Sequence, residues 1–293
     1  MILQNKIREL QKTGVSYTKI AKSCGYSSAV ISSWLKGNYK GDVKSLEKAI
    51  NAFLNNLNEK QQQKAFEIHF VDTLNSRQVF ALCKIAHFDK KMCVVTSDSG
   101  MGKTASLKEY SSRNPGTILI EVDPTYNPKK LFKTLHQKIG RSGKGLLENI
   151  YQDCVEYFKD SDRLVIVDEA ELLNHKSIEL LRRLYDKAGI GIILAGMPVL
   201  IENIRGIRSE FAQLYTRIGG SMKLKAFSKN DVKKVLVPYF NASNEIVNSF
   251  YNYCKQNGRT LSMLIFQVVR IVEENGCNIN DKLIKQAAEM LEV

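Results

Sequence analysis

Short apolar runs alternate with helical stretches through the middle of the chain. The runs lie at about residues 92–97, 117–122, 164–168, 190–195 and 221–225. Apolar runs of this length are typical of strands that are buried on both faces of a sheet. Helical stretches between such strands favour parallel strands joined by crossover helices. The pattern therefore predicts an α/β fold with a parallel five-stranded sheet.

Both ends of the chain are predicted to be helical. Residues 1–57 carry apolar side chains at helical spacing. Residues 228–293 contain four amphipathic segments, of which Ser228 begins the first and Gly258 the third. The stretch between residues 55 and 64 is polar and poor in β-branched residues, as linkers are. We therefore expect four parts: an N-terminal helical domain (1–60), a linker (61–75), an α/β core (76–227) and a C-terminal helical domain (228–293).

Two short helices joined by a tight turn are predicted between Ser16 and Gly37. Ser16 can cap the first helix, Gly25 can make the turn, and Ser27 or Ser28 can cap the second helix. The pattern resembles the helix-turn-helix of phage-repressor-type DNA-binding domains, whose second helix enters the major groove. A compact three-helix bundle for protein contacts is the alternative. The residues expected to face DNA are Ser28, Ala29, Ser32 and Ser33, followed by Lys36.

A phosphate-binding loop is predicted where the first strand ends. An apolar run is followed by two glycines, and Lys103 and Thr104 then open a helical segment. In such a loop backbone N–H groups surround the phosphates, the lysine reaches the terminal phosphates, and the threonine hydroxyl holds Mg²⁺. Ser97 stands where the usual pattern has its first glycine. A Gly-Lys turn before a surface helix is the alternative. The expected ATP-binding residues are Ser97, Asp98, Ser99, Gly100, Met101, Gly102, Lys103, Thr104 and Ala105.

An acidic pair ends the third predicted strand. Leu-Val-Ile-Val leads directly into Asp168 and Glu169, and ligands bind at the carboxyl ends of parallel strands. Asp168 is expected to hold Mg²⁺ together with Thr104, and Glu169 to polarise the attacking water. A solvated acidic pair at the beginning of a helix is the alternative. With the phosphate-binding loop upstream, the pair predicts a protein that binds ATP and Mg²⁺.

The charge of the chain points to a polyanionic partner. The formal net charge is +13, and residues 1–60 alone hold ten Lys and Arg against four Asp and Glu, an excess of +6. Between Tyr126 and Gly145 there are basic residues and no acidic one, which is either a solvated face or a surface for phosphate backbones. The candidates for DNA contact are Lys129, Lys130, Arg141 and Lys144, the last two in a glycine-flanked loop.

The remaining composition excludes several other classes of protein. No apolar run reaches the roughly 18 residues of a membrane span, so nucleic acid is a better partner than a membrane. The six cysteines form no C-x-x-C pair, which favours a reducing compartment over a disulfide framework or a zinc site. We therefore expect a cytoplasmic protein whose metal is Mg²⁺.

Several motifs together resemble AAA+ ATPases, and more narrowly the target-DNA-binding ATPases of DNA transposition, the family of phage Mu transposition protein B. They are Ser32-Ser-Trp-Leu-Lys-Gly-Asn-Tyr-Lys-Gly41, Phe70-Val-Asp-Thr-Leu-Asn-Ser-Arg-Gln78, Ser99-Gly-Met-Gly-Lys-Thr104, Val167-Asp-Glu-Ala-Glu171, Leu194-Ala-Gly-Met-Pro198 and Leu214-Tyr-Thr-Arg-Ile-Gly219. The resemblance implies a P-loop ATPase core, a C-terminal helical lid, and nucleotide sites between subunits. It also implies a homo-oligomer, a filament or ring that assembles with ATP on double-stranded DNA, delivers this target DNA to a transposase, stimulates strand transfer, and disassembles on hydrolysis.

The resemblance also assigns roles to individual residues. Lys103 and Glu169 are the expected catalytic residues, with Arg217 as an arginine finger that acts in the neighbouring subunit and Arg205 or Arg208 as alternatives. Arg259 lies near the second sensor, in the lid. The first-sensor position falls in Ala195-Gly-Met197, without the usual polar side chain. We therefore expect a slow, DNA-stimulated ATPase that converts ATP and water to ADP and phosphate.

Three functions remain open on the sequence alone. The first is the transposition ATPase just described. The second is an ATP-sensing transcription regulator, which needs sequence discrimination by its helix-turn-helix; the predicted contact residues there are mostly Ser and Ala and include no Arg, Gln or Asn for bidentate base contacts. The third is a helicase-loader-type AAA+ ATPase, which needs a helicase-docking segment that we do not recognise here.

Overall fold

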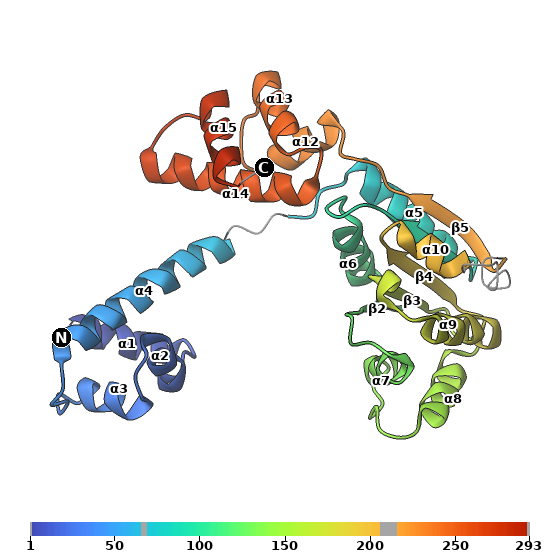
Figure 1. The fold of residues 1–293 in the computed structure, drawn as a ribbon, viewed down its shortest axis with the longest axis horizontal. Helices are drawn as coiled ribbons and strands as arrows, with labels where there is room; N and C mark the ends of the chain where they lie inside the picture. The colour runs from blue at the N-terminus through green and yellow to red at the C-terminus, as the bar shows by residue number, and fades with distance from the viewer. Residues whose placement is uncertain (1, 66–68, 206–215, 292–293) are drawn as a thin grey trace. The chain divides into compact units, whose positions relative to one another are not determined.

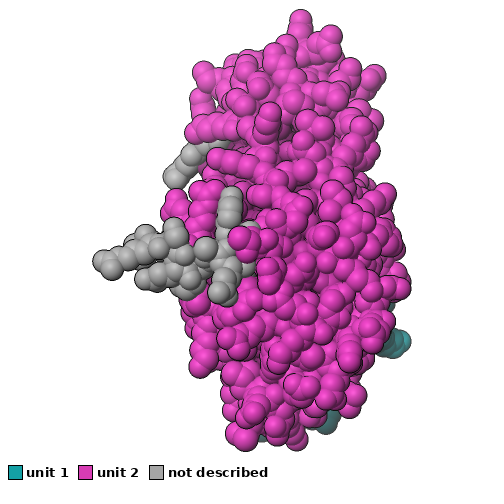
Figure 2. Space-filling view, turned by 90° about the vertical axis from the view of Figure 1, so that its right-hand side faces the viewer, with its two compact units in different colours: residues 1–68 teal, residues 69–293 magenta. Residues whose placement is uncertain are grey.

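The computed structural model describes residues 2–65, 69–205 and 216–291. The chain divides into two compact units, residues 1–68 and residues 69–293, which are coloured separately in Figure 2. The first unit contains α1 (Ile2–Lys12), α2 (Tyr17–Cys24), α3 (Ser28–Leu35) and α4 (Val43–Ala65). The second unit contains all five strands and the remaining helices (Figure 1).

The N-terminal unit has the two predicted helices and the predicted turn. Ser16 caps α2 by accepting a hydrogen bond from the N–H of Lys19, and Ser27 caps α3 by accepting from the N–H of Val30. Gly25 has a φ of 75°, in the left-handed region that glycine adopts without strain. The apolar residues of α2 and α3 pack with those of α1 and α4 around Trp34. Whether α3 contacts DNA remains a prediction.

Helix α4 continues into the segment predicted as a linker. It ends at Ala65, so residues 61–65 are helical. The polar composition of this segment suggested a linker, but Gln, Lys, Glu and Ala are strong helix formers and no Gly or Pro interrupts them. A polar helix end and a polar linker therefore cannot be distinguished by composition here.

The second unit is built on a parallel five-stranded sheet, as predicted. Its order is β2-β3-β4-β1-β5, and all the paired strands run parallel. Strand β1 lies inside the sheet, between β4 and β5, which agrees with its apolar composition because both of its faces are buried. The strands are β1 (Met92–Thr96), β2 (Thr117–Glu121), β3 (Leu164–Asp168), β4 (Gly191–Gly196) and β5 (Ile218–Lys223).

Strand β5 begins earlier than the sequence predicted. Ile218 pairs with Met92, and the register shifts before Gly220 pairs with Cys93. The two consecutive glycines of this segment have low strand propensity, so the apolar pattern placed the strand at residues 221–225. Pairing with β1, rather than local propensity, sets where this edge strand begins.

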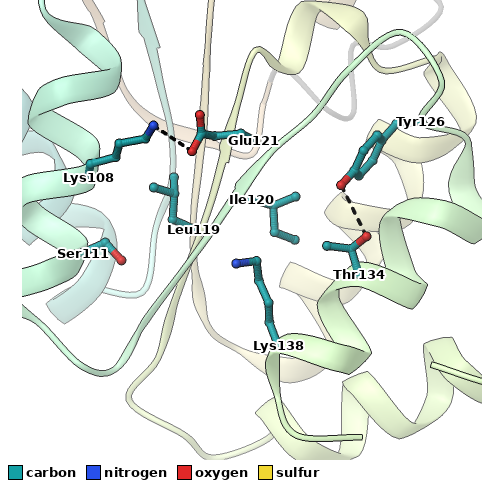
Figure 3. A pocket seen from close by; sticks show the side chains of 8 residues that line it. All are labelled: Lys108, Ser111, Leu119, Ile120, Glu121, Tyr126, Thr134 and Lys138. Carbon is teal, nitrogen blue, oxygen red and sulfur yellow. Dashed lines mark hydrogen bonds and ion pairs between the residues drawn. The ribbon is translucent and has the colours of Figure 1, made fainter. Parts of the chain in front are cut away.

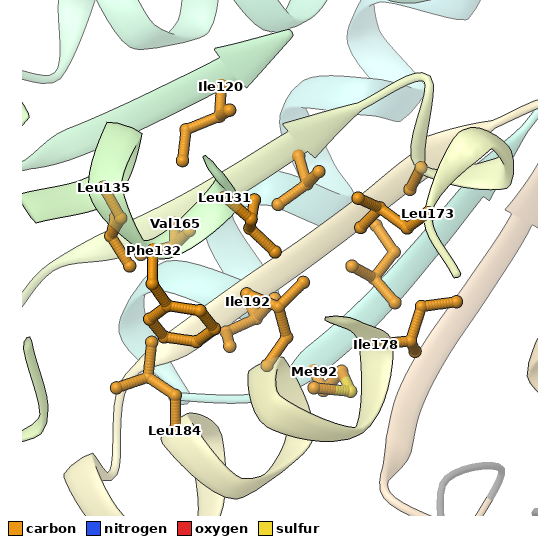
Figure 4. Packing of buried hydrophobic residues seen from close by; sticks show 14 of the residues in the cluster. Met92, Ile120, Leu131, Phe132, Leu135, Val165, Leu173, Ile178, Leu184 and Ile192 are labelled. Carbon is orange, nitrogen blue, oxygen red and sulfur yellow. The ribbon is translucent and has the colours of Figure 1, made fainter. Parts of the chain in front are cut away.

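Successive side chains of the strands point to opposite faces, and each face has its own cluster of buried residues. Cys93 and Val95 pack against α5 (Leu74–Phe88) and α6 (Lys103–Arg113). Met92 and Val94 belong to the larger cluster, which Figure 4 shows around Phe132 and Ile192. This period of two explains why the strands appear as continuous apolar runs. The helices of the larger cluster are α7 (Pro128–Lys138), α8 (Leu147–Phe158), α9 (His175–Ala188) and α10 (Val199–Arg205).

Four helices follow β5 in the described part of the chain: α12 (Lys229–Leu236), α13 (Asn244–Tyr253), α14 (Gly258–Asn275) and α15 (Asp281–Met290). As predicted, Ser228 caps the first and Gly258 begins the third. Throughout residues 2–65, 69–205 and 216–291, no helix has the length and apolar character needed to cross a membrane.

Asp231 joins the C-terminal helices to the beginning of α5. Its Oδ1 accepts a hydrogen bond of 2.9 Å from the N–H of Leu74, and its Oδ2 accepts one of 2.6 Å from the Ser228 hydroxyl. Burial alone would raise the pKa of Asp231, but these hydrogen bonds to the ionised form hold the pKa below its ordinary value. Asp231 therefore stabilises the fold in its charged state.

We expect Asp231→Ala to lower the Tm by about 4–8 °C, because an unpaired buried N–H costs about 2 kcal/mol. Since the folded-state pKa is lowered, the contribution is complete above the unfolded carboxyl pKa of about 4 and is lost as the pH falls further. Thermal unfolding of the full chain at several pH values measures both effects. Asp89→Ala, an exposed carboxylate at the end of α5, is the control; an equal loss in the control would contradict this role.

Candidate active site

The loop between β1 and α6 has the backbone geometry of a phosphate-binding loop. Gly100 and Gly102 have φ values of 82° and 81°, which a residue with a side chain rarely adopts. Gly102 is the N-cap of α6 and supplies no side-chain acceptor. The first N–H groups of α6, where Lys103 is the first residue, are therefore directed out of the helix as an anion site requires.

Ser97 replaces the usual first glycine of the loop without backbone strain. Its φ is not in the left-handed region, and its N–H donates a hydrogen bond of 3.1 Å to the carbonyl of Gly196 at the end of β4. The side chain is 0% exposed. The fold thus accommodates the serine in its interior, and this departure from the usual pattern leaves the glycine turn intact.

The hydroxyl of Thr104 and the carboxylate of Asp168 meet at the carboxyl ends of β1 and β3. Thr104 Oγ1 donates a hydrogen bond of 2.6 Å to Asp168 Oδ2, and Asp168 is only 1% exposed. Hydroxyl and carboxylate oxygens are the ligands that Mg²⁺ prefers. The residues expected to hold the metal therefore lie together, and their donor set fits it.

Glu169 follows Asp168 with an unusual backbone. Its φ is 57°, in the left-handed region, at a cost of about 1–2 kcal/mol for a non-glycine residue. Its N–H donates a hydrogen bond of 3.0 Å to Asp168 Oδ1, and its side chain is exposed. Strain of this kind is concentrated at functional sites, and here it turns the chain sharply at the end of β3.

Residues from outside the loop hold its carbonyl groups. Asn257, the N-cap of α14, donates 2.8 Å to the carbonyl of Ser99, and the N–H of Gly258 donates 2.8 Å to that of Gly100. Asn75 on α5 donates 3.0 Å to the carbonyl of Met101. Neither asparagine was predicted from the sequence. The N-cap position before Gly258 was a usable signal for Asn257, whereas nothing local indicates Asn75.

The comparisons with known proteins agree with this geometry. The AAA domain family matches residues 86–204, from the end of α5 into α10. The chain is 27% identical over 248 residues to the Mu-like prophage FluMu DNA transposition protein B of Haemophilus influenzae, covering 80% of this chain and 84% of the relative. It is 28% identical to the ATP-dependent target DNA activator B of Escherichia phage Mu, covering 75% and 72%. The chain is a homologue of the Mu-type B proteins.

The fold of this chain also matches solved ATPases. The ORC2 protein of Aeropyrum pernix superposes with a TM-score of 0.60 at 14% identity, covering 76% of this chain and 70% of that one. The RuvB branch migration motor of Thermotoga maritima superposes with a TM-score of 0.51 at 13% identity, covering 76% of this chain and 70% of that one. These matches and the AAA domain establish an AAA+ ATPase fold, a nucleotide-binding fold.

Asn257 has two roles, as the N-cap of α14 and as a hydrogen-bond donor to the phosphate-binding loop, and two variants can separate them. Asn257→Ala and Asn280→Ala each remove an N-cap in the C-terminal helices, so each should lower the Tm by about 2–4 °C. Of these two caps only Asn257 contacts the loop, so only its variant should weaken ATP binding, by about tenfold for one lost hydrogen bond. Calorimetric titration with ATP measures this, and equal ATP affinities of the two variants would contradict a role for Asn257 in the loop.

Arg217 and Arg259 lie at different places in the chain. Arg217 is exposed just before β5, with its Nε 3.0 Å from Asp186 Oδ1 on α9. Arg205 is exposed at the end of α10, and Arg208 lies outside the described residues. Arg259 is exposed in the first turn of α14, two residues after the asparagine that contacts the loop. Within this chain, Arg259 is thus in the helix that meets the phosphate-binding loop.

The predicted DNA-contact residues of the N-terminal unit lie on α3. Ser28 is exposed at the beginning of the helix, Ser32 and Ser33 are half-buried, and Lys36 is exposed at the C-cap. The structure therefore leaves the N-terminal end of α3 accessible. The available side chains are short hydroxyls, which distinguish bases weakly.

The basic residues of the core differ in their availability. Lys129 is exposed on α7, whereas Lys130 Nζ lies 3.2 Å from Asp123 Oδ2 and 4.3 Å from the centre of the Tyr126 ring. In the sequence alone the two lysines are equivalent. A phosphate would have to compete with Asp123 for Lys130, so Lys129 is the better candidate of the two.

The loop that carries Arg141 and Lys144 is anchored by a buried histidine. His136 Nδ1 accepts a hydrogen bond of 3.0 Å from the N–H of Gly143, and its Nε2 lies 3.2 Å from Asp153 Oδ2 on α8. Arg141 and Lys144 are both exposed. The fold thus presents these two charges to solvent on a loop with a defined attachment.

A separate pocket of about 460 Å³ lies at the outer edge of the sheet, between α6, β2 and α7 (Figure 3). Lys108 on one side pairs with Glu121 at 3.0 Å, and Tyr126 on the other side contacts Thr134 at 3.3 Å. Lys138 also lines it. None of the residues expected to bind ATP is in its lining, so the pocket is distinct from the phosphate-binding loop.

Proposed function

We propose that this chain is an ATP-dependent, largely sequence-nonspecific DNA-binding protein that oligomerises on duplex DNA, delivers target DNA to a transposase and stimulates strand transfer. ATP hydrolysis, slow and stimulated by DNA, disassembles the oligomer. The observation that carries the proposal is the hydrogen bond between Thr104 and buried Asp168 beside the glycine loop. It lies in the AAA domain of a chain whose relatives are named DNA transposition protein B and ATP-dependent target DNA activator B.

The roles proposed at the nucleotide follow from the chemistry of each group. The loop N–H groups and Lys103 bind the phosphates, and Thr104 and Asp168 hold Mg²⁺, which neutralises phosphate charge when bound. Glu169 takes a proton from the attacking water. Arg217 is proposed to act in the neighbouring subunit, and its exposure and its pairing with Asp186 in this chain mean that it would exchange partners on assembly. Arg259 is proposed to contact the nucleotide from the lid.

DNA binding is proposed to depend mainly on the core. Lys129, Arg141 and Lys144 are exposed around α7 and its following loop, and phosphate contacts of this type do not depend on base sequence. The short side chains of α3 favour a supporting role for the N-terminal unit. This assignment distinguishes the proposal from a transcription regulator, in which α3 would supply the specific contacts.

We expect Arg141→Ala/Lys144→Ala to weaken DNA binding about equally for unrelated duplexes. For each phosphate contact that is lost, binding should release about one counterion fewer. The slope of log K against log salt should therefore flatten by roughly one to two units per bound subunit. Filter binding with ATP across a salt series, on two duplexes of different sequence, measures both quantities.

The matched control is Lys255→Ala/Lys282→Ala, which removes the same charge from two exposed positions, one in the turn after α13 and one on α15. It should leave the slope near that of the wild type. Equal flattening by both double variants would indicate a general effect of net charge, and an unchanged slope for Arg141→Ala/Lys144→Ala would refute the proposed contact.

A further inference from the structure

The end of β4 lies beside the phosphate-binding loop and has no side chain of its own. Gly196 pairs with Thr96, the last residue of β1, and its carbonyl accepts the hydrogen bond from Ser97. A Cβ added to Gly196 would lie 2.2 Å from Oε2 of Glu171. The carboxylate of Glu171 therefore occupies the space that a side chain at position 196 would need.

Glu171 reaches this space from the turn after β3. It lies in the short 3-10 helix η1 (Ala170–Leu172), and Asn203 on α10 donates a hydrogen bond of 3.1 Å to its backbone carbonyl. Because the turn begins with the left-handed Glu169, both glutamates are positioned by the same turn of the backbone. The Asn203 contact gives Glu171 a fixed attachment on the side of α10.

Oε2 of Glu171 is buried and has no hydrogen-bond partner among the described residues. The hydroxyl of Ser97, which is completely buried and adjoins Gly196 through its backbone, also has none among them. Unpaired buried polar atoms are costly and rare in folded proteins, and they point to an absent water, ion or ligand. Here both atoms belong to residues that adjoin Gly196, at the carboxyl end of β4.

We propose that Glu171 is a positioning residue of the ATPase site, whose Oε2 accepts a hydrogen bond from the attacking water. This inference rests on the proposed ATPase function. The water oxygen bonds to the γ-phosphorus, the bond from that phosphorus to the bridging oxygen breaks with its electron pair going to ADP, and the water proton passes to Glu169. Glu171 orients the water and takes no part in the proton transfer. Gly196 is glycine because a side chain would displace this carboxylate.

We expect Glu171→Ala to slow turnover by about tenfold to a hundredfold, comparable to the loss of one oriented hydrogen bond at a reacting centre. Its Kd for ATP, measured by calorimetric titration, should stay within about threefold, since the contact is to water rather than to phosphate. Glu202→Ala removes an exposed glutamate of α10 and should change neither quantity. Turnover of Glu171→Ala within about threefold of the wild type would overturn the proposal.

A second acceptor, placed at position 196, tests the contact between Glu171 and the space beside Gly196. Gly196→Asn alone should lower the Tm, because its side chain collides with Glu171. Combining it with Glu171→Ala frees the space, so the double variant should have a higher Tm than Gly196→Asn. It should also turn over faster than Glu171→Ala, because the amide oxygen replaces the lost acceptor. A Tm for the double variant at or below that of Gly196→Asn, or turnover no faster than that of Glu171→Ala, would overturn the proposal.

The wild type and Lys103→Ala are measured in the same assay. If hydrolysis by the wild type is lost in Lys103→Ala, the proposed ATPase stands whatever the result at Glu171. If the two hydrolyse ATP equally, the ATPase assignment fails and the role of Glu171 fails with it. A parallel fall in Tm and ATP affinity in Glu171→Ala would mean that the residue supports the fold alone.

Discussion

Lys103→Ala is expected to remove ATP binding and, with it, ATP-dependent binding of DNA. Lys103 opens α6 directly after the left-handed Gly102, where its ammonium group can reach the terminal phosphates. A charged hydrogen bond of this type contributes about 3 kcal/mol, so the affinity for ATP should fall by about 100-fold or more. Fluorescence titration with a labelled ATP analogue measures the affinity, and filter binding measures DNA retention.

Lys108→Ala is the matched control for this variant. Lys108 lies on the same helix, but its ammonium group pairs with Glu121 at 3.0 Å in the outer pocket. Its removal should leave ATP affinity within about threefold of the wild type, since an exposed ion pair contributes less than about 1 kcal/mol. ATP-stimulated DNA retention by Lys103→Ala at the wild-type level would show that the loop does not bind the phosphates.

Glu169→Gln is expected to keep ATP binding and to slow hydrolysis by about 100-fold. An amide can still orient the water but cannot take its proton, and general-base catalysis contributes at least this factor. Because hydrolysis is proposed to disassemble the oligomer, complexes of this variant with DNA should persist. Phosphate release measures turnover, and dissociation from labelled DNA after dilution measures persistence.

The informative comparison is with Glu202→Gln, which alters an exposed glutamate on α10 and should turn over normally. Turnover of Glu169→Gln within about threefold of the wild type would show that another group is the base. Slow turnover combined with rapid dissociation from DNA would support Glu169 as the base and refute disassembly by hydrolysis.

The sequence predicted those parts of the fold that local pattern determines. The apolar runs of β1 and β3 are buried on both faces, so composition alone placed them correctly. The edge strand β5 was predicted a few residues late, because its glycines carry no strand signal and the pairing with Met92 decides its beginning. Residues 61–65 were predicted as linker although they are helical, since helix formers and linker residues overlap in polarity.

In the candidate site, too, the residues of local motifs could be predicted from the sequence and those that act through tertiary contacts could not. The loop glycines and the pair Asp168 and Glu169 are local motifs, and the structure brings Asp168 to Thr104 as their positions at strand ends imply. Asn75 and Glu171 could not be assigned from the sequence, because Asn75 contacts a loop far from it in the chain and Glu171 fills a space left by another residue. Asn257 could be recognised as an N-cap, but its contact with the loop depends on the tertiary fold.

The basic stretch shows a further limit of charge counting. Composition identified Lys129 and Lys130 as equivalent, but tertiary contacts pair Lys130 with Asp123 and leave Lys129 exposed. The histidine that anchors the following loop also has no signal in the sequence, since its partners Gly143 and Asp153 are set by the packing of α7 against α8. Availability for DNA is therefore a property of the folded structure.

The most direct test of the account is the nucleotide dependence of DNA binding by the full chain. Filter binding on two duplexes of unrelated sequence, with ATP and Mg²⁺, with ADP, and without nucleotide, measures both ATP dependence and specificity. We expect tight binding only with ATP, and Kd values for the two duplexes that agree within about threefold, as phosphate contacts require. Binding that does not need ATP and prefers one duplex, with the same preference shown by residues 1–60 alone, would contradict the account and indicate a sequence-specific regulator.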